Sequence, residues 1–334
     1  MDLRAHYWTV APRLRGSWAP LAPPPSRPWE TWVEDPAIGP VRLTGRLAAG
    51  ADGGAGGGEL LVVVHGLSGC CDSVAVVRAA RAARAAGLAT LRLNLRGSDR
   101  RERDFYHAGL TADLHAALAS PELAGFTRIY LLGWSLGGHL ALRAATEPAD
   151  PRLAAVAALC APLDLAAAVD AIDRPGLWAY RRAVLGGLKE IYAACAARRP
   201  GPLPVAAARR VARLREWDDR VVAPRHGFAG AADYYTRMSV GPRLPALRVP
   251  ALYLGALRDP MVPAAAVRPS LEPHADAPLE VRWLARGGHC AFPEPVEPGV
   301  IEWLRAARRS PRQGPRAPYA AGGTARSRRA AGRR

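Results

Sequence analysis

The amino-acid sequence predicts an α/β protein with a doubly wound, mostly parallel sheet and an inserted helical cap. Three observations lead to this fold class. Apolar runs of strand length alternate with segments of helical pattern over most of the chain. One long interval, residues 162–250, shows several helical patterns and no clear strand. The chain has 334 residues, of which 49% are hydrophobic and 22% charged, so it can bury a large core.

The first 58 residues contain two short strand candidates, at 29–33 and 41–47. Residues 1–28 are rich in proline with scattered tryptophan, and we expect an irregular N-terminal arm there. The segment 48–58 is almost entirely glycine and alanine, which indicates a flexible surface loop. We therefore expect the folded domain to begin at residue 29.

From residue 59 onward, strand and helix patterns alternate. The apolar segment 59–64 is typical of a strand buried on both faces, as in a parallel sheet. The later elements are predicted at 73–86 (helix), 88–94 (strand), 110–118 (helix), 128–133 (strand), 136–146 (helix), 153–160 (strand), 251–255 (strand), 279–284 (strand) and 298–309 (helix). This alternation indicates βα units and a doubly wound sheet.

The domain organisation follows from these elements. We expect one α/β domain over residues 29–309, with the helical cap at about 162–250 inserted between two strands rather than folding by itself. Residues 310–334 are low in complexity and rich in arginine, and we expect a disordered basic tail.

The net charge of +17 is concentrated at the C-terminus. Residues 305–334 contain ten arginines and no acidic residue, and the rest of the chain has 36 basic against 29 acidic residues. We interpret the tail as a solvated basic segment and expect no specific nucleic-acid binding. A tail that contacts nucleic acid without specificity, or weakly contacts an anionic membrane surface, is the alternative.

The cysteine pattern and the terminus suggest a reduced, cytoplasmic enzyme. Five cysteines without a C-x-x-C pair favour neither a disulfide framework nor a zinc site. Metal-ligand spacings and a phosphate-binding loop are missing from the sequence, so we expect no metal and no cofactor. Cys290, beside a candidate catalytic histidine, is interpreted as a small packed residue. The sequence contains neither a membrane-spanning apolar run nor a secretory signal at Met1, and it does not indicate an oligomeric state.

The strongest functional signal is Gly133-Trp-Ser135-Leu-Gly137, which matches G-x-S-x-G. A strand pattern precedes it and a helix pattern follows it, which is the context of a nucleophile elbow. The turn is so tight that a Cβ at its flanking positions would collide with backbone. It places the serine hydroxyl at the carboxyl edge of the sheet, where open α/β sheets bind ligands. Ser135 is therefore the predicted nucleophile.

A serine hydroxyl needs a general base, and the base needs a partner that orients it. In the α/β-hydrolase fold these groups follow the order serine, acid, histidine. His289 lies in a glycine-flanked loop after the predicted strand 279–284 and is the predicted base. Asp259 follows the strand 251–255 and is the predicted acid. Asp164, after an earlier strand, is an alternative acid, although its position also suits the N-cap of the next helix.

Acyl transfer also needs donors for the negatively charged oxygen of the tetrahedral intermediate. The helix after the elbow supplies backbone N–H groups at its N-terminus. His65-Gly66-Leu67 follows the first buried strand, where this fold usually supplies another donor. We therefore predict an oxyanion hole formed by the backbone amides of Leu67 and Leu136. The His65 side chain is expected to organise this loop rather than to act as a base.

Several segments resemble the YheT-like α/β-hydrolases, which are related to plant embryogenesis-associated hydrolases. The resemblance spans residues 60–305, and its most specific part is in the cap. The matching segments are His65-Gly-Leu-Ser-Gly69, Leu93-Asn-Leu-Arg-Gly97, Phe105-Tyr-His-Ala-Gly109, Gly133-Trp-Ser-Leu-Gly-Gly138, Glu216-Trp-Asp-Asp219, Ala223-Pro-Arg-His-Gly-Phe228, Asp233-Tyr-Tyr235 and Asp259-Pro-Met-Val-Pro263.

The resemblance implies hydrolysis of carboxylic esters, on short acyl esters or, for some relatives, on lipids and phospholipids. The family's triad positions fall on Ser135, Asp259 and His289, which agrees with the assignment from the residues themselves. The glycine-rich segment 53–58 and the arginine-rich tail depart from the usual pattern. Membrane or partner contacts of relatives are therefore not carried over to this chain.

The sequence thus predicts a serine hydrolase that cleaves short-chain acyl or lipid esters through an acyl-enzyme on Ser135. Its expected partner is a small-molecule ester or lipid substrate. Two alternatives remain. The same triad could transfer the acyl group to an alcohol or a thiol, or the fold could be a catalytically silent binding module.

Overall fold

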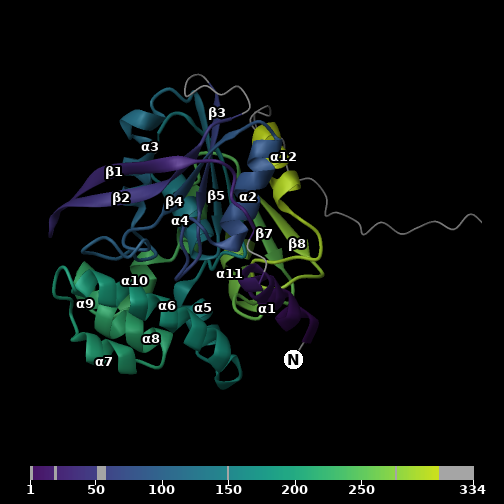
Figure 1. Ribbon diagram of the computed structural model, residues 1–334. Helices are drawn as coiled ribbons and strands as arrows, with labels where there is room; N and C mark the ends of the chain where they lie inside the picture. Colours follow the sequence, from purple (N-terminus) through teal and green to yellow (C-terminus); the bar gives the residue numbers. More distant parts are fainter. Residues whose placement is uncertain (1–2, 19–20, 51–57, 149, 275–276, 308–334) are drawn as a thin grey trace, which may run out of the picture.

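The computed structural model describes residues 3–18, 21–50, 58–148, 150–274 and 277–307. An eight-stranded sheet crosses the molecule, helices cover both of its faces, and a group of cap helices lies beyond one end of the strands (Figure 1). The predicted fold class, a doubly wound and mostly parallel sheet with an inserted helical cap, is confirmed.

The strands follow the order β1-β2-β4-β3-β5-β6-β7-β8 across the sheet. Only the pairs β1–β2 and β2–β4 are antiparallel, and the other five pairs are parallel. The strands are β1 (Arg27–Asp35), β2 (Gly39–Ala48), β3 (Glu59–Val64), β4 (Ala89–Asn94), β5 (Arg128–Trp134), β6 (Leu153–Leu159), β7 (Ala251–Ala256) and β8 (Leu279–Leu284).

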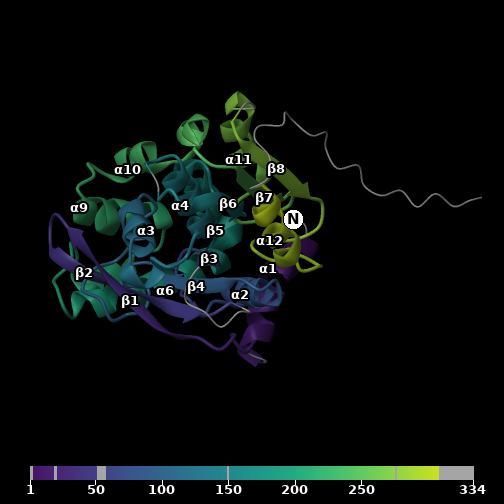
Figure 2. The same ribbon diagram turned by 90° about the horizontal axis from the view of Figure 1, so that it is seen from above.

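Helices cover both faces of the sheet, which is best seen from above (Figure 2). Helices α2 (Val74–Ala85) and α12 (Glu297–Ala307) pack on one face, together with side chains such as Leu61 and Leu132. On the other face lie α3 (Thr111–Leu118), α4 (Leu136–Ala145) and α11 (Ala264–Leu271). Because the central strands are covered on both sides, they are apolar at nearly every position, which is the pattern of the sequence at 59–64.

The strand order reverses at β3, and this position defines the functional edge. The chain goes from β3 to β4 on one side and returns to β5 on the other side of β3. The connections that leave β3 and β5 therefore diverge to opposite faces through α2 and α4. A crevice forms outside the carboxyl ends of two such strands, which is where doubly wound folds bind ligands.

The cap is the segment between β6 and β7, and it covers this carboxyl edge (Figure 1). Its helices are α5 (Leu165–Ile172), α6 (Trp178–Ala196), α7 (Val205–Arg210), α8 (Leu214–Trp217), α9 (Ala223–His226) and α10 (Ala231–Met238). The cap also contains the short helical turns η2 (Pro175–Leu177), η3 (Asp218–Val222) and η4 (Gly241–Ala246). Two further short turns, η1 (Pro121–Leu123) and η5 (Glu272–His274), lie outside the cap.

The prediction of an irregular arm over residues 1–28 is wrong for Leu3–Trp18, which forms helix α1. The prolines concentrate after this helix, where they prevent its continuation, and Pro12 is the only one within it. Ala5 and Thr9 are buried against the loop after β8. Tertiary packing therefore stabilises a helix for which the local composition gave no signal.

Two sequence predictions lie outside the described residues. The glycine-rich loop falls mainly on 51–57, and the basic tail falls on 310–334. Within the described part of the chain, none of the helices combines the length and the apolar character needed to span a membrane.

Candidate active site

Ser135 occupies the sharp turn between β5 and α4. Its backbone adopts φ 52° and ψ −119°, a conformation that residues with a Cβ rarely adopt. The flanking glycines make the turn feasible, because a Cβ at Gly133 would overlap the carbonyl oxygen of Gly137. Likewise, a Cβ at Gly137 would overlap the carbonyl oxygen of Val64 on the neighbouring strand. The structure thus places the Ser135 hydroxyl at the carboxyl edge of the sheet.

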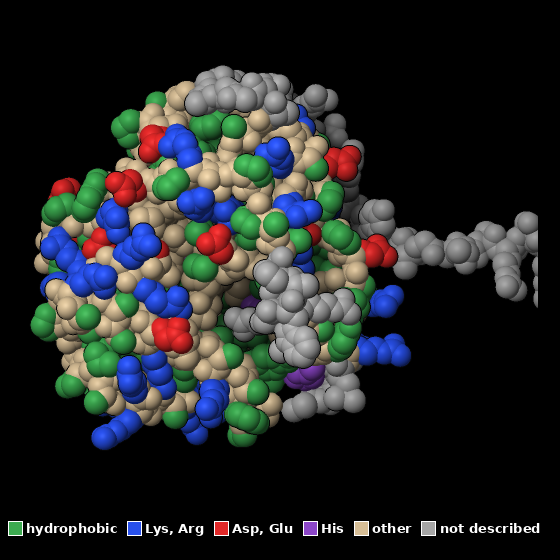
Figure 3. Space-filling view, viewed as in Figure 1, with side chains coloured by type: hydrophobic (Ala, Val, Ile, Leu, Met, Phe, Trp, Pro, Cys, Tyr) green, Lys and Arg blue, Asp and Glu red, His purple; other side chains and the backbone are tan. Residues whose placement is uncertain are grey.

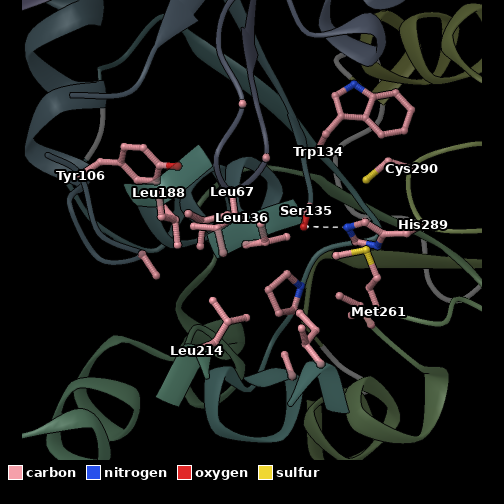
Figure 4. A pocket seen from close by; sticks show the side chains of 18 of the residues that line it. Leu67, Tyr106, Trp134, Ser135, Leu136, Leu188, Leu214, Met261, His289 and Cys290 are labelled. Atoms are coloured by element: carbon pink, nitrogen blue, oxygen red, sulfur yellow. Dashed lines mark hydrogen bonds between the residues drawn. The ribbon is translucent and has the colours of Figure 1, made fainter. Parts of the chain in front are cut away.

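The three residues predicted as a catalytic triad form one chain of hydrogen bonds. The Ser135 hydroxyl lies 3.0 Å from Nε2 of His289 (Figure 4), and Nδ1 of His289 lies 2.8 Å from Oδ2 of Asp259. With Nδ1–H donating to the carboxylate, Nε2 is left as the acceptor for the serine proton. The sequence order and the strand positions had suggested this group, and the structure brings its members together.

Asp259 is held so that one carboxylate oxygen faces the histidine. Its side chain is 1% exposed, and its Oδ1 accepts the backbone N–H groups of Met261 and Val262 at 2.8 and 2.9 Å. The other oxygen, Oδ2, is bound to Nδ1 of His289. These bonds fix the carboxylate in the turn after β7, so the orientation of the imidazole is also fixed.

The electrostatic surroundings of His289 stabilise an imidazolium, the form that the ring takes after it accepts a proton at Nε2. Burial on its own would lower the pKa of His289, but the Asp259 carboxylate and the neighbouring Cys290 raise this pKa well above 6.5. An imidazole with a raised pKa is a stronger base for the serine proton.

Asp164, the alternative acid, has a different position. It is the N-cap of α5, and its Oδ1 accepts the backbone N–H of Ala167 at 3.0 Å. This bond satisfies one of the free donors at the start of the helix. The structure therefore brings Asp259, and not Asp164, into contact with His289.

The loop after β3 lies against the serine. A Cβ at Gly66 would stand 3.2 Å from the Cβ of Ser135, so the backbone here approaches the elbow closely. Leu67 follows in this loop, and Leu136 is the first residue of α4. Figure 4 shows both residues beside Ser135. The N–H of Leu136 belongs to the first turn of a helix, where backbone donors have no intrahelical acceptor.

The side chain of His65 fixes the start of this loop. Nδ1 of His65 lies 2.7 Å from the carbonyl oxygen of Gly66, while Nε2 accepts the N–H of Leu95 at 3.1 Å. Nε2 also lies 3.0 Å from Oγ of Ser98. This pattern requires a neutral imidazole with its proton on Nδ1. His65 is fully buried and does not contact the serine, so it organises the loop as the sequence predicted.

A pocket of about 450 Å³ opens beside Ser135 between the sheet and the cap. Figure 3 shows the hollow between the upper α/β body and the lower cap. Most of its exposed surface is apolar. The aliphatic and aromatic lining includes Leu67, Val184, Leu188, Ile191, Leu214, Trp217 and Tyr235. Such a pocket suits a hydrophobic portion of a substrate, with the triad at its wall.

Sequence analysis missed two contributions to this site. Oγ1 of Thr9, on helix α1, accepts the backbone N–H of His289 at 2.9 Å and so supports the histidine loop. Cys160 and Cys290 lie beside the His289 ring, and the three side chains could together hold a metal ion. Neither contact had a sequence signal, because the residues involved are 280 and 130 positions apart.

Comparisons with known proteins agree with the geometry. A family model described as the Alpha/beta hydrolase family matches residues 61–298. The Escherichia coli (strain K12) protein YheT, whose name marks it as a candidate esterase, is 33% identical over 241 residues, which are 70% of each chain. The embryogenesis-associated protein EMB8 of Picea glauca is 28% identical over 222 residues, which are 61% of this chain and 47% of that protein.

A solved structure, the Pyrococcus furiosus esterase Pf2001, matches the fold with a TM-score of 0.55 at 16% identity. The match covers 84% of this chain and 93% of the esterase. At this identity it shows the fold alone. The match to the family model and the identity with YheT go further. The residues that match the family model include the elbow and the histidine loop. The chain belongs to the alpha/beta hydrolase family, and within it to the YheT-like group.

Proposed function

We propose that this protein is a serine hydrolase that cleaves carboxylic esters through an acyl-enzyme on Ser135. The observation that supports this most directly is the hydrogen-bonded chain from Ser135 through His289 to Asp259 at the wall of an apolar pocket. A nucleophile, a base and an orienting acid in this geometry activate a serine hydroxyl. Esterase names among the related proteins are consistent with this chemistry.

In the first step, Oγ of Ser135 attacks the ester carbonyl carbon and its proton passes to Nε2 of His289. The Asp259 carboxylate stabilises the resulting imidazolium without taking the proton. The backbone amides of Leu67 and Leu136 are the proposed donors to the oxyanion. When the intermediate collapses, the C–O bond to the alcohol breaks, and the leaving alkoxide takes the proton from His289.

In the second step, water replaces the alcohol. His289 removes a proton from the water as the oxygen attacks the acyl carbon, and the second tetrahedral intermediate uses the same two amides. Its collapse breaks the bond to Oγ of Ser135, which recovers its proton from His289. The products are a carboxylic acid, an alcohol and the free enzyme.

The pocket suits an ester with an apolar acyl or alcohol portion. Its lining is mainly aliphatic and aromatic, and the polar residues that reach it include Ser135 and His289 as well as Asp72, His107 and Asp218. A small ester or a lipid ester therefore fits the chemistry of the lining better than a charged, extended substrate does.

A fluorophosphonate probe tests the proposal, because it reacts only with an activated serine. The wild-type protein is expected to be labelled and to hydrolyse activated esters, while Ser135→Ala shows neither and unfolds at a similar temperature. Residual hydrolysis within about tenfold of wild type in Ser135→Ala would contradict the assignment. A wild-type protein that is not labelled would instead indicate a silent binding module.

The products distinguish hydrolysis from acyl transfer. An ester substrate is supplied with and without an added alcohol or thiol, and the released acid is measured against the new ester or thioester. The proposal expects the acid as the main product in both mixtures. A new ester or thioester as the main product would favour the transferase alternative.

A further inference from the structure

Two cysteines from distant parts of the chain meet at the candidate catalytic histidine. Cys160 directly follows β6, and Cys290 directly follows His289 in the loop after β8. The two sulfur atoms and a ring nitrogen of His289 all lie within 4.8 Å of one another. The backbone N–H of Cys290 also points at Sγ of Cys160, at 3.4 Å. Figure 4 shows the Cys290 sulfur between Trp134 and the imidazole.

These three side chains are a donor set that zinc prefers. Thiolate sulfur and imidazole nitrogen bind Zn²⁺ at about 2.3 and 2.0 Å, which separates ligand atoms around one tetrahedral ion by about 3.5–3.8 Å. Because each separation is at most 4.8 Å, none has to shrink by more than about 1.3 Å, a change within the reach of side-chain rotation. Three protein ligands with a free fourth position is a known arrangement for zinc.

The histidine is already oriented as a zinc ligand. Its Nδ1 is bound to the Asp259 carboxylate, so Nε2 is the nitrogen left for a metal. Metal-binding histidines usually donate their other ring N–H to a carboxylate in this way. The negative charge of Asp259 also favours a cation near the ring. The guanidinium of Arg78, which binds the Cys290 carbonyl oxygen, is paired with Glu297 at 2.8 Å.

The site is reachable from solvent, since Cys290 and His289 line the pocket and Cys160 lies behind them at 1% exposure. Both cysteines have a left-handed backbone conformation, with φ of 51° and 59°. Non-glycine residues adopt such conformations only where the surrounding structure imposes them, and these cluster at functional sites. The two side chains are thus held toward the histidine.

We propose that Cys160, Cys290 and Nε2 of His289 bind a thiophilic divalent cation of the zinc type, and that the bound ion blocks the hydrolase. Binding forms two sulfur–metal bonds and one nitrogen–metal bond, and the two thiol protons leave to solvent. The ion takes the nitrogen that accepts the serine proton, so Ser135 loses its base. The inhibition rests on the proposed function, whereas the metal site itself does not.

Cobalt(II) tests the site without any use of activity. Titration of the reduced full-length protein with Co²⁺ is expected to give a thiolate-to-cobalt charge-transfer band that saturates at one equivalent. Cys160→Ser, Cys290→Ser and the double variant are expected to lose the band. Cys70→Ser is the matched control and should retain it, because this half-buried cysteine lies outside the cluster. Ser135→Ala should also retain it, since the serine is not a ligand.

A variant with a partial effect tests whether the Asp259 carboxylate orients the histidine for metal binding. Asp259→Asn leaves the three ligands in place but removes the carboxylate behind the imidazole, and it is expected to weaken metal affinity by about 10- to 100-fold. Circular dichroism of each variant establishes that it is folded. The site is refuted if the folded wild type gives no thiolate band, or if the folded double variant keeps it.

Turnover and labelling then show what the ion does. Stoichiometric Zn²⁺ is expected to abolish ester hydrolysis and fluorophosphonate labelling of the wild type, and a chelator should restore both. The double variant, compared with its own metal-free rate, should be insensitive to Zn²⁺. A cobalt band without any turnover would leave the site standing and overturn the proposed function. If the wild type gives no thiolate-to-cobalt band and Zn²⁺ does not change its turnover, the proposed metal site is wrong.

Discussion

At the residue scale, the strained backbone positions of this protein gather at one edge of the sheet. All five described non-glycine residues with positive φ follow a parallel strand: Ser68 after β3, Arg100 after β4, Ser135 after β5, Cys160 after β6 and Cys290 after β8. Each such conformation costs on the order of 1–3 kcal/mol and persists only if its surroundings impose it. The core of the sheet therefore supplies the stability that keeps these strained positions in place at the edge that carries the candidate triad.

Asp259 provides the sharpest single-residue prediction. Asp259→Asn preserves the size of the side chain but favours the wrong imidazole tautomer, so turnover on an activated ester is expected to fall by about 10⁴-fold. Asp164→Asn is the matched control, because Asp164 caps α5 and asparagine is an equally good N-cap. Steady-state kinetics of the two purified variants make the comparison. A large loss in Asp164→Asn together with a mild one in Asp259→Asn would contradict the assignment.

At the element scale, two helical glycines have contrasting surroundings, one at the tight turn that carries Ser135 and one at an ordinary helix position. Gly137, in the first turn of α4, faces the carbonyl oxygens of Val64 and His65 so closely that a Cβ would overlap them. Gly186, within α6, has no atom within 4 Å of the position its Cβ would take. The first glycine is required by the approach of a helix to a strand, while the second is only a weak helix former.

Alanine substitutions are therefore expected to act in opposite directions at these glycines. Gly137→Ala forces α4 away from β3, so it should destabilise the fold by about 1–3 kcal/mol and abolish turnover. Gly186→Ala should stabilise the fold by about 0.5–1 kcal/mol and leave turnover unchanged. Urea unfolding and ester hydrolysis measure both effects. Equal activity of the two variants would show that the elbow tolerates a Cβ.

The elements that the sequence predicted share a strong local signal. Strands β3 and β8 have the predicted bounds, and most other strands and helices differ by a residue or two, because buried strands are apolar throughout and amphipathic helices repeat regularly. Helix α1 was missed because its stability comes from the contact of Ala5 and Thr9 with the histidine loop. That contact joins residues 280 positions apart in the sequence, and no local pattern encodes it.

The candidate site likewise has residues with a recognisable sequence signal and residues that only the fold brings together. Ser135, Asp259 and His289 could be found because each follows a strand and their order is characteristic of the fold. The pair Cys160 and Cys290 could not be found, since metal-site motifs rely on short spacings and these cysteines meet only through the arrangement of β6, β7 and β8. Each cysteine alone was an unremarkable small residue.

At the scale of the whole molecule, a buried ionic network joins the cap to the body. Arg225 of α9 donates two hydrogen bonds of 2.6 Å to Asp104, which also binds Arg96 at 2.8 Å. Arg96 in turn binds Asp113 and, in the β1–β2 hairpin, Asp35. Burial would lower the pKa of Arg96, but these carboxylates raise it, so the guanidinium remains charged. The network therefore holds three separate segments together beside the pocket.

Buried histidines make the stability of this fold depend on pH. Burial lowers the pKa of His65 to about 4, although its bond to the Gly66 carbonyl opposes the shift. Burial, followed by the charges of Arg225 and Arg96, lowers the pKa of His226 to about 3. Below pH 6.5 the unfolded chain protonates these side chains while the folded protein does not. The unfolded state then binds more protons than the folded state. The free energy of unfolding therefore falls as the pH decreases from about 6.5 toward the pKa values that these histidines have in the folded protein.

His65 contributes a measurable part of this acid sensitivity. With a pKa of about 4 when folded and 6.5 when unfolded, it should lower the free energy of unfolding by about 2 kcal/mol between pH 7 and pH 5. Protonation of Nε2 would also break the bond from the backbone N–H of Leu95, because the nitrogen could no longer accept it. His65→Gln cannot be protonated and offers an amide donor and acceptor in its place, so its stability should decline less over the same interval. Urea unfolding of both proteins at pH 7 and pH 5 gives the four values required, and an identical decline in wild type and variant would show that His65 does not carry this effect.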